Sequence, residues 1–495
     1  MTVFFIKAAQ LMFALAVLVL IHELGHFTFA KLFKVRVDKF YLFFNPQISI
    51  FRFKKVNGKL KFKFFAKNLQ YETPVLDENG APKLDKKGKK IMQPIPTDTL
   101  ADDDWRKYPD NTEWGLGWIP LGGYCKIGGM MDESMDKNVK NIRHENWAYE
   151  SHPVWQRMLI DAGGVIFNFV SAIIIFAMML FHYGEEYIPV RNEYLGYNYC
   201  QTAINHGFMN GDRILTVNGD TIEEKSQAVE KIVIEGKTNI VLVRDSQKVT
   251  LNLPANFGEQ MISAKEKIFM TERVPFVIDG VTKGATADVA GLQSGDSVVG
   301  LNSKQIFEYQ DIANELAKCA GKKVNIDFYR NGEFHTNSIT IDENGKLGVS
   351  LRRMQTFFQT KRTEYGFFAS FPAGWRTGVE TLTSYVKQFR LVFTKAGAKN
   401  LGGFGTIGSI FPSEWNWAAL WSMTAFLSVI LAFMNILPIP VLDGGHLLFL
   451  LYELIFRRKP SDKFMEVSLT IGLYLLIALM IFANGNDILR ALGLM

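Results

Sequence analysis

Four apolar stretches, each long enough to cross a lipid bilayer, constrain the fold of this chain more than any other feature. They run from Val3 to Ile21, Ile160 to Leu180, Leu420 to Leu437 and Val467 to Ala483. A membrane-spanning helix needs about 20 apolar residues, so the sequence predicts four transmembrane helices. The first stretch is too long for a cleaved signal peptide and no small-residue cleavage site follows it, so we expect it to remain in the protein.

Basic residues near the ends of these stretches predict the orientation in the membrane, because such residues stay on the cytoplasmic side. The flanking residues are Lys31, Lys34, Arg36, Lys39, Arg157, Arg457, Arg458, Lys459 and Lys463. Both termini and the segment from about residue 181 to 411 are then expected on the opposite side of the membrane. These flanks and a Lys-rich loop explain the net charge of +6. Nothing indicates nucleic-acid binding, which would need a basic face on a folded domain.

The pentapeptide His22-Glu23-Leu24-Gly25-His26 lies at the end of the first apolar stretch. Residues four apart share one face of a helix, so His22 and His26 can present two imidazoles to one metal ion. Glu23 can then act as a general base on a water molecule. Two packed histidines in an ordinary helix are the alternative. That alternative is costly, because buried charged and polar groups among apolar residues need compensation.

A third ligand is needed, since hydrolytic zinc sites have three protein ligands and an open position for water. The spacing of a third histidine typical of metzincins is absent, whereas a glutamate from a later helix stays possible. Asp443 is a better candidate, because it is an ionisable group near membrane depth. It follows Pro438 and Pro440, which we expect to break the third helix, and precedes Gly444-Gly445, where we expect a sharp turn.

The segment after the second apolar stretch contains an internal repeat. Gly207 to Ile222 reappears as Gly291 to Ile306, and a helical pattern and a strand pair follow each copy. The copies resemble PDZ domains of bacterial proteases, which bind peptide ends or extended segments at a sheet edge. The three cysteines have no metal-binding spacing, and we expect free thiols. They are Cys125, Cys200 and Cys319.

Between the first two apolar stretches, Asp38 to Phe65 alternates apolar and basic residues around Asn57-Gly58, which predicts a β-hairpin. A polar stretch from about Glu72 to Glu113 predicts an insertion, either a surface loop or a partly ordered subdomain. Gly117 to Tyr124 is expected to be an apolar loop. Further along, Phe367 to Thr394 is amphipathic and suits the membrane interface.

Together these motifs resemble the site-2 protease family of intramembrane zinc metalloproteases, in the bacterial branch with tandem PDZ domains. His22 to His26 matches the H-E-x-x-H motif, Asn435 to Gly444 matches N-x-x-P-x-x-x-L-D-G, and Gly163 to Asn168 matches a small-residue motif. The resemblance implies Zn²⁺ held by His22, His26 and Asp443, with Glu23 as the catalytic base. It also implies contacts to substrate from Asn435, Asn168, Gly122 and Gly123. For the two asparagines, packing hydrogen bonds between helices are the alternative.

The predicted fold class is a multi-pass α-helical membrane protein with four transmembrane helices, a membrane-associated β-hairpin or sheet, and two periplasmic α+β PDZ domains. The expected segments in chain order are 1–34 (first helix), 35–70 (β element), 71–116 (insertion), 117–156 (cleft-lining loop region), 157–183 (second helix), 193–257 and 270–351 (PDZ domains), 362–412 (amphipathic linker), 417–456 (third span) and 464–485 (fourth helix).

The implied function is cleavage, in the bacterial inner membrane, of transmembrane segments in single-pass proteins that another protease has already trimmed. Anti-sigma factors and remnant signal peptides are examples. The expected partners are such substrates and membrane lipids, with peptide segments at the PDZ domains. The free hairpin edge would hold an unwound substrate as an added strand; a hairpin merely packed on the membrane surface is the alternative. The other function classes are a non-catalytic PDZ scaffold or assembly factor and a transporter, although no inverted repeat is evident.

Overall fold

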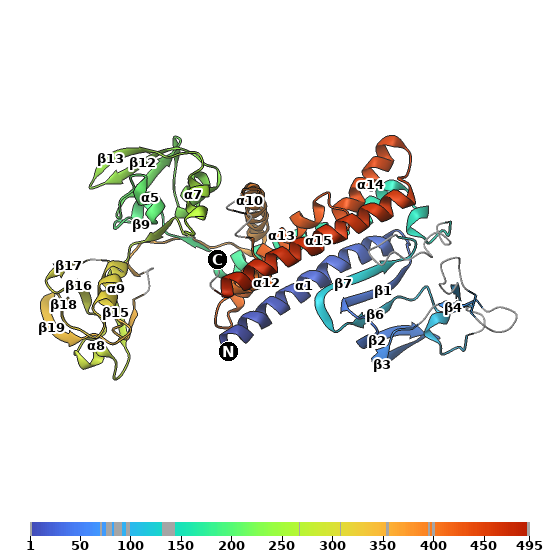
Figure 1. Ribbon diagram of the computed structural model, residues 1–495, viewed down its shortest axis with the longest axis horizontal. Coiled ribbons are helices and arrows are strands. Elements are labelled where there is room, and N and C mark those ends of the chain that lie inside the picture. Colours follow the sequence, from blue (N-terminus) through green and yellow to red (C-terminus); the bar gives the residue numbers. More distant parts are fainter. Residues whose placement is uncertain are drawn as a thin grey trace. The chain divides into compact units, whose positions relative to one another are not determined.

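The computed structural model describes residues 2–69, 72–75, 82–83, 92–95, 100–130, 144–266, 268–306, 308–352, 356–394, 397 and 401–492. The chain forms two compact units (Figure 1). Unit 1 comprises Met1–Tyr183, Tyr365–Tyr385 and Leu401–Met495, and unit 2 comprises Gly184–Glu364 and Val386–Asn400.

Among the described residues of unit 1, four helices are long and apolar enough to cross a membrane. They are α1 (Thr2–Leu32), α4 (Gly163–Tyr183), α13 (Trp417–Ile436) and α15 (Asp462–Ala491). This confirms the four predicted spans and makes the chain an integral membrane protein. Helix α1 continues well past the apolar stretch, so the whole His22–His26 motif is helical. A separate short helix, α3 (Val154–Asp161), precedes α4.

Small residues bring α1 and α4 into close contact at the level of the histidines. A Cβ atom on Gly163 would lie only 2.7 Å from the carbonyl oxygen of Gly25, and one on Gly164 only 2.6 Å from Nε2 of His26. Glycines at such positions let two helix backbones approach closely within a membrane. The imidazoles of α1 are therefore pressed against the backbone of α4.

The third span ends at Ile436, as Pro438 and Pro440 predict, and a new helix, α14 (Asp443–Phe456), follows after six residues. The expected turn at Gly444-Gly445 is wrong. Both glycines lie in the first turn of α14, where a Cβ atom on Gly445 would approach the Ile439 oxygen to 2.5 Å. The backbone instead reverses at Val441, whose φ of 93° is unusual for a β-branched residue.

A five-stranded sheet in unit 1 has the order β3-β2-β6-β1-β7. Its strands are β1 (Val37–Phe44), β2 (Ile48–Val56), β3 (Lys59–Lys67), β6 (Glu113–Leu116) and β7 (Ile119–Ile127). The predicted hairpin is present as β2–β3, with Asn57 and Gly58 at φ values of 48° and 74° in its turn. Strand β7 lies at the opposite edge of the sheet and against α1 (Figure 1).

Two segments of this sheet differ from the sequence expectation. Gly117 to Tyr124, expected as a loop, mostly belongs to β7, whose pairing with β1 includes a register shift near Phe44. The end of the expected insertion belongs to β6, because the buried Glu113 bonds to Arg52 and to the Tyr41 hydroxyl. A short pair, β4 (Glu72–Pro74) and β5 (Met92–Pro94), precedes it. Much of the 71–116 insertion lies outside the described residues.

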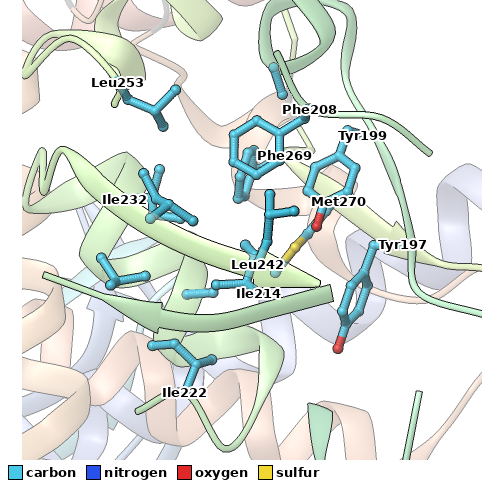
Figure 2. Packing of buried hydrophobic residues seen from close by; sticks show 14 of the residues in the cluster. Tyr197, Tyr199, Phe208, Ile214, Ile222, Ile232, Leu242, Leu253, Phe269 and Met270 are labelled. Atoms are coloured by element: carbon cyan, nitrogen blue, oxygen red, sulfur yellow. The ribbon is translucent and has the colours of Figure 1, made fainter. Parts of the chain in front are cut away.

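Unit 2 contains the two predicted copies of the repeat. The first copy has β9 (Tyr197–Tyr199), α5 (Gln201–Asn205), β10 (Arg213–Val217), β11 (Asp220–Thr221), α6 (Lys225–Val229), η5 (Glu230–Ile234), β12 (Asn239–Arg244), β13 (Gln247–Asn252), α7 (Phe257–Ser263) and β14 (Met270–Glu272). The second has β15 (Phe276–Val281), α8 (Thr286–Val289), β16 (Ser297–Leu301), β17 (Lys304–Gln305), α9 (Tyr309–Lys318), β18 (Lys323–Arg330), β19 (Glu333–Thr340) and β20 (Val349–Leu351). Figure 2 shows the apolar core of the first copy, which includes Phe208, Ile214 and Leu242.

The same ion pair closes both copies. Arg244 donates to both carboxylate oxygens of Asp212, at 2.8 and 2.7 Å, and to the Gly207 carbonyl. Arg330 makes the equivalent bonds to Asp296, at 2.8 and 2.7 Å, and to Gly291. The Gly-Asp pairs in the sequence repeat therefore have a structural cause, because the buried aspartate needs the arginine of the later hairpin.

The remaining elements join these parts. Strand β8 (Glu185–Tyr187) pairs with β21 (Lys361–Thr363) in unit 2. Helix α10 (Phe367–Val392) covers the segment expected to be amphipathic, and α12 (Phe404–Ile410) precedes α13. The cysteine thiols are free, as expected.

Candidate metal centre

Three side chains of metal-binding type converge in unit 1. His22 and His26 come from α1 and Asp443 from the first residue of α14. The two Nε2 atoms are 3.2 Å apart, and Oδ2 of Asp443 lies 3.3 Å from His22 Nε2 and 3.6 Å from His26 Nε2. Ligand atoms about 3.3 Å apart suit a tetrahedral ion with bonds of about 2.0–2.1 Å. The structure thus brings together the three residues that the sequence selects as ligands.

The donor atoms also fit a cation chemically. Oδ2 of Asp443 is buried and has no hydrogen-bond partner among the described residues. It faces the Nε2 atoms of two imidazoles, whose lone pairs can bind the same cation. A buried carboxylate oxygen left in this way is costly unless a cation or a proton compensates it. A zinc ion coordinated by two nitrogens and one oxygen would supply that compensation.

The rear nitrogen of each imidazole is held by a group outside the ligand set. Nδ1 of His26 lies 2.8 Å from the carbonyl oxygen of Ile160 in α3, so it carries the hydrogen and donates. This leaves Nε2 as an acceptor that points at the site. Such outer partners fix the tautomer of metal-binding histidines.

Asn168 of α4 occupies the same position behind His22, with its amide 3.2 Å from Nδ1. Its buried Oδ1 has no partner among the described residues. An amide rotated end for end would accept the Nδ1 hydrogen through Oδ1 and free Nε2 for a metal. The hydroxyls of Ser171 and Ser428 donate to the Asn168 carbonyl at 2.8 and 2.7 Å, which holds this part of α4 against α13.

Glu23 follows His22 on α1 and is half-buried. A Cβ atom on Gly123 of β7 would lie 3.5 Å from Glu23 Cγ and 2.8 Å from a Val19 methyl. The Glu23 carboxylate acts electrostatically on His26 and on Cys125. Burial raises the pKa of the Cys125 thiol, and the Glu23 charge adds to that effect. Glu23 therefore lies close to the edge strand β7 at Gly123, where a larger side chain would collide with Val19 and with the Tyr41 carbonyl oxygen.

The other residues implied to contact substrate are spread around this centre. Asn435 lies in the last turn of α13, before the break that leads to Asp443. Gly122, at φ 151°, neighbours Gly123 on β7. A Cβ atom on Gly122 would lie 2.8 Å from the Phe44 ring. Of the four residues implied to contact substrate, Asn168 is the one with a described hydrogen bond to a ligand residue, His22.

Sequence reasoning missed an ion pair and a cavity beside the centre. Arg157 of α3 makes two bonds to Glu453 of α14, at 2.7 and 3.0 Å, and both side chains are largely buried. They line a cavity of about 350 Å³ that Asp161 and His446 also line. A lone Glu453 in an apolar helix and Arg157 at the start of a span are the sequence signals that could have revealed this pair.

Comparison with known proteins agrees with this geometry. The chain matches the model of peptidase family M50 over residues 10–66 and 104–479. It is 28% identical to a "Putative zinc metalloprotease" of Neisseria meningitidis over 77% of this chain and 89% of that protein. It is 27% identical to the "Regulator of sigma E protease" of Haemophilus influenzae over 96% of this chain and 97% of that protein. The chain therefore belongs to peptidase family M50, the site-2 proteases, and is a zinc metalloprotease.

Proposed function

We propose that His22, His26 and Asp443 hold the zinc ion and that the enzyme cuts peptide bonds inside transmembrane segments. The convergence of three ligand atoms, one of them a buried oxygen without a hydrogen-bond partner among the described residues, carries this proposal. These atoms come from α1, which is long and apolar enough to span a membrane, and from the helix that follows α13. A cut at this level acts on a substrate within the bilayer.

The roles of the protein groups follow from their positions. A zinc ion bound here supplies a Lewis acid that polarises a carbonyl and lowers the pKa of water. The Glu23 carboxylate accepts the proton of the attacking water and passes it to the leaving amine. The Ile160 carbonyl and the Asn168 amide keep both imidazoles turned toward the reaction, so these two residues position the ligands.

The substrate class is a single-pass membrane protein whose outward domain has been removed. A helical segment hides its carbonyls in internal hydrogen bonds, so it must be unwound before attack. Among the described strands β7 pairs only with β1, so one edge of β7 is free to take an added strand. Because β7 lies against Glu23, it suits this role better than the hairpin edge β3 at the far side of the sheet. Asn435, Gly122 and Gly123 are the further candidates for substrate contact.

The Haemophilus relative is named as a regulator of a sigma factor. We extend this to the chain as a proposal: its substrates include anti-sigma factors and remnant signal peptides in the bacterial inner membrane. The basic flanks support a periplasmic location for both termini and for unit 2. The two copies of the repeat are PDZ domains that select substrates. The same Arg–Asp ion pair in both copies supports a common fold, and PDZ domains bind peptides at a sheet edge.

The test compares Glu23→Gln with wild-type protein in detergent. The substitution keeps the size of the side chain but removes its basicity. We expect retained zinc and cleavage of a model transmembrane substrate reduced by about 10²–10⁴-fold. Metal analysis and gel-based cleavage assays measure both quantities.

Glu466→Gln, on the exposed surface of α15, is the matched control and should cleave at the wild-type rate. Substantial cleavage by Glu23→Gln would remove this residue from the mechanism. Zinc-loaded wild-type protein that cleaves no transmembrane segment would favour the alternative, a non-catalytic PDZ scaffold.

A further inference from the structure

A second polar pocket lies in unit 2, where the first copy of the repeat meets β8. Its volume is about 310 Å³. It lies between Glu272 on β14 and the start of α6, and β8 forms another wall. No residue of the proposed zinc site lines it.

A buried glutamate, Glu193, lines the pocket. Glu193 is 1% exposed, and its Oε2 has no hydrogen-bond partner among the described residues. The buried hydroxyl of Tyr197 is in the same situation. Figure 2 shows this hydroxyl at the margin of the apolar core, pointing away from it. An unsatisfied buried polar group is costly, so the Glu193 oxygen in the pocket lining favours a ligand that brings a hydrogen-bond donor.

The charge of the lining also favours a cation. Glutamates from four places contribute to it: Glu186, Glu193, Glu224 and Glu272. Lys225 is the one basic residue of the described lining, and it pairs with Glu272. Tyr187 and Ile188 add apolar surface. A side chain with an alkyl stem and a cationic head matches this combination.

The second copy shows that the fold itself does not need these polar groups. Tyr197 and Ile278 make equivalent backbone bonds, to Asp212 and Gly211 in one copy and to Asp296 and Gly295 in the other. Their cross-strand partners are Glu272 and Leu351.

The other two polar positions are likewise uncharged in the second copy. Helix α6 starts at Lys225 and α9 starts at Tyr309. Four residues before Tyr197 stands Glu193, whereas four residues before Ile278 stands Val274. Glu193, Lys225 and Glu272 are thus particular to the first copy, whereas Glu224 has a counterpart in Glu308, the residue before α9. The repeated fold forms without the first three of these groups.

We propose that this pocket binds the Lys or Arg side chain of an extended peptide segment, with Glu193 and Glu272 as its anionic partners. Among the described strands β14 pairs only with β9, so its other edge is free to take such a segment beside the pocket. The inference concerns unit 2 alone and holds whether or not the proposed cleavage is correct.

Binding should depend on pH in a defined direction. The pKa of Glu193 is raised to about 7, mainly by burial and also by the charge of Glu272, while Lys225 acts in the opposite direction. Tyr187, Tyr197, Glu186 and Glu224 are the other titratable groups around the pocket. Two cations lie near the tyrosines: Lys361 bonds to Tyr187, and Arg213 acts on Tyr197. Below pH 7 Glu193 is mostly neutral and attracts a cation weakly. Affinity should therefore rise between pH 6 and pH 8.

The test uses the full chain in detergent and a fluorescein-labelled peptide, Gly-Ser-Arg-Ser-Gly, followed by fluorescence anisotropy. The matched probe carries citrulline, which keeps the shape of arginine without its charge. We expect the arginine probe to bind at least about tenfold more tightly, the effect of one charge-assisted hydrogen bond. Glu193→Gln and Glu272→Gln should each remove this preference, and Glu193→Gln should also abolish the rise with pH. Lys225→Met, which removes the competing cation, should tighten binding several-fold.

The control is Glu259→Gln, because Glu259 is exposed on α7 and does not line the pocket. It should bind the arginine probe like the wild type. Equal affinity for the two probes in the wild type would overturn the proposal. So would an unchanged preference in a folded Glu193→Gln protein, or weaker binding by Lys225→Met.

Discussion

Asp296 in unit 2 and Asp443 in unit 1 are both aspartates with buried carboxylate oxygens, but their surroundings differ. Asp296 accepts two bonds from Arg330 and a third from the backbone of Gln293. Oδ2 of Asp443 has no such bond among the described residues and instead faces two imidazole nitrogens. A closed set of bonds stabilises a fold, whereas an open set leaves room for a ligand. The comparison therefore distinguishes a structural buried carboxylate from a functional one by whether its oxygens have hydrogen-bond donors within the protein.

The largest effect should come from Asp443→Ala, which removes an anionic ligand while leaving both histidines. We expect loss of nearly all bound zinc with little loss of folded protein, because no described hydrogen bond depends on Oδ2. His446→Ala, one turn further along α14, should retain its zinc. Metal analysis of both purified proteins measures the outcome. The reverse pattern would move the ligand to His446 and end the contrast with Asp296.

Asp296→Ala should do the opposite and destabilise unit 2 by about 3 kcal/mol, since it leaves Arg330 and the Gln293 amide without their acceptor. Zinc content should stay unchanged. Chemical denaturation followed by a probe in unit 2 measures the loss. Asp212→Ala is the natural partner variant, because Arg244 makes the same bonds in the first copy. Zinc loss from either variant would show that these carboxylates also affect zinc binding, and that their role is not purely structural.

Gly164→Ala tests whether the ligand geometry depends on the close approach of α4. The new methyl group would lie 2.5 Å from His22 Nδ1 and 2.6 Å from His26 Nε2, so the imidazoles must shift. We expect zinc affinity to fall by an amount equivalent to about 2 kcal/mol. Competition with a chelator of known affinity measures it. Gly485→Ala in α15, where a methyl group meets nothing within 4 Å, is the control and should keep wild-type affinity.

Asn168→Ala should have the smallest effect, a loss of roughly tenfold in zinc affinity, because it removes only the group that orients His22. Ser171→Ala, which leaves the Asn168 amide in place, serves as its control. The same chelator competition applies. If Asn168→Ala keeps wild-type zinc affinity but loses cleavage, its role is contact with substrate rather than orientation of the ligand.

The sequence predicted the parts of the centre that depend on local spacing. Two histidines one turn apart and an aspartate after a proline-broken helix are visible as patterns, and the structure places them together. The sequence also predicted the repeat, because its Gly-Asp pairs recur with the same neighbours. These features follow from residues that are close in the chain.

The rest depended on contacts between distant segments and could not be predicted from local patterns. Gly122 and Gly123 suggested a loop, but they lie in a strand because β1 offers a pairing edge. A side chain at Gly122 would collide with Phe44, and one at Gly123 would collide with Val19 of α1. Gly444-Gly445 suggested a turn, but these residues begin a helix that packs closely against the preceding backbone. The partner of His26 is the carbonyl of Ile160, and a backbone group carries no residue signature.

The Arg157–Glu453 pair has a consequence for how α14 moves. Near its C-terminal end this helix is tied to α3 by two hydrogen bonds between Arg157 and Glu453. At its first residue, Asp443 faces the two imidazoles of α1 with which it would share a metal. Ion binding should therefore stabilise the first turn of α14 against local unfolding. Backbone amides there should exchange with solvent faster after chelation, while those near Glu453 keep their protection. The exchange rate of the amides in the first turn of α14 would thus report whether the metal centre is occupied.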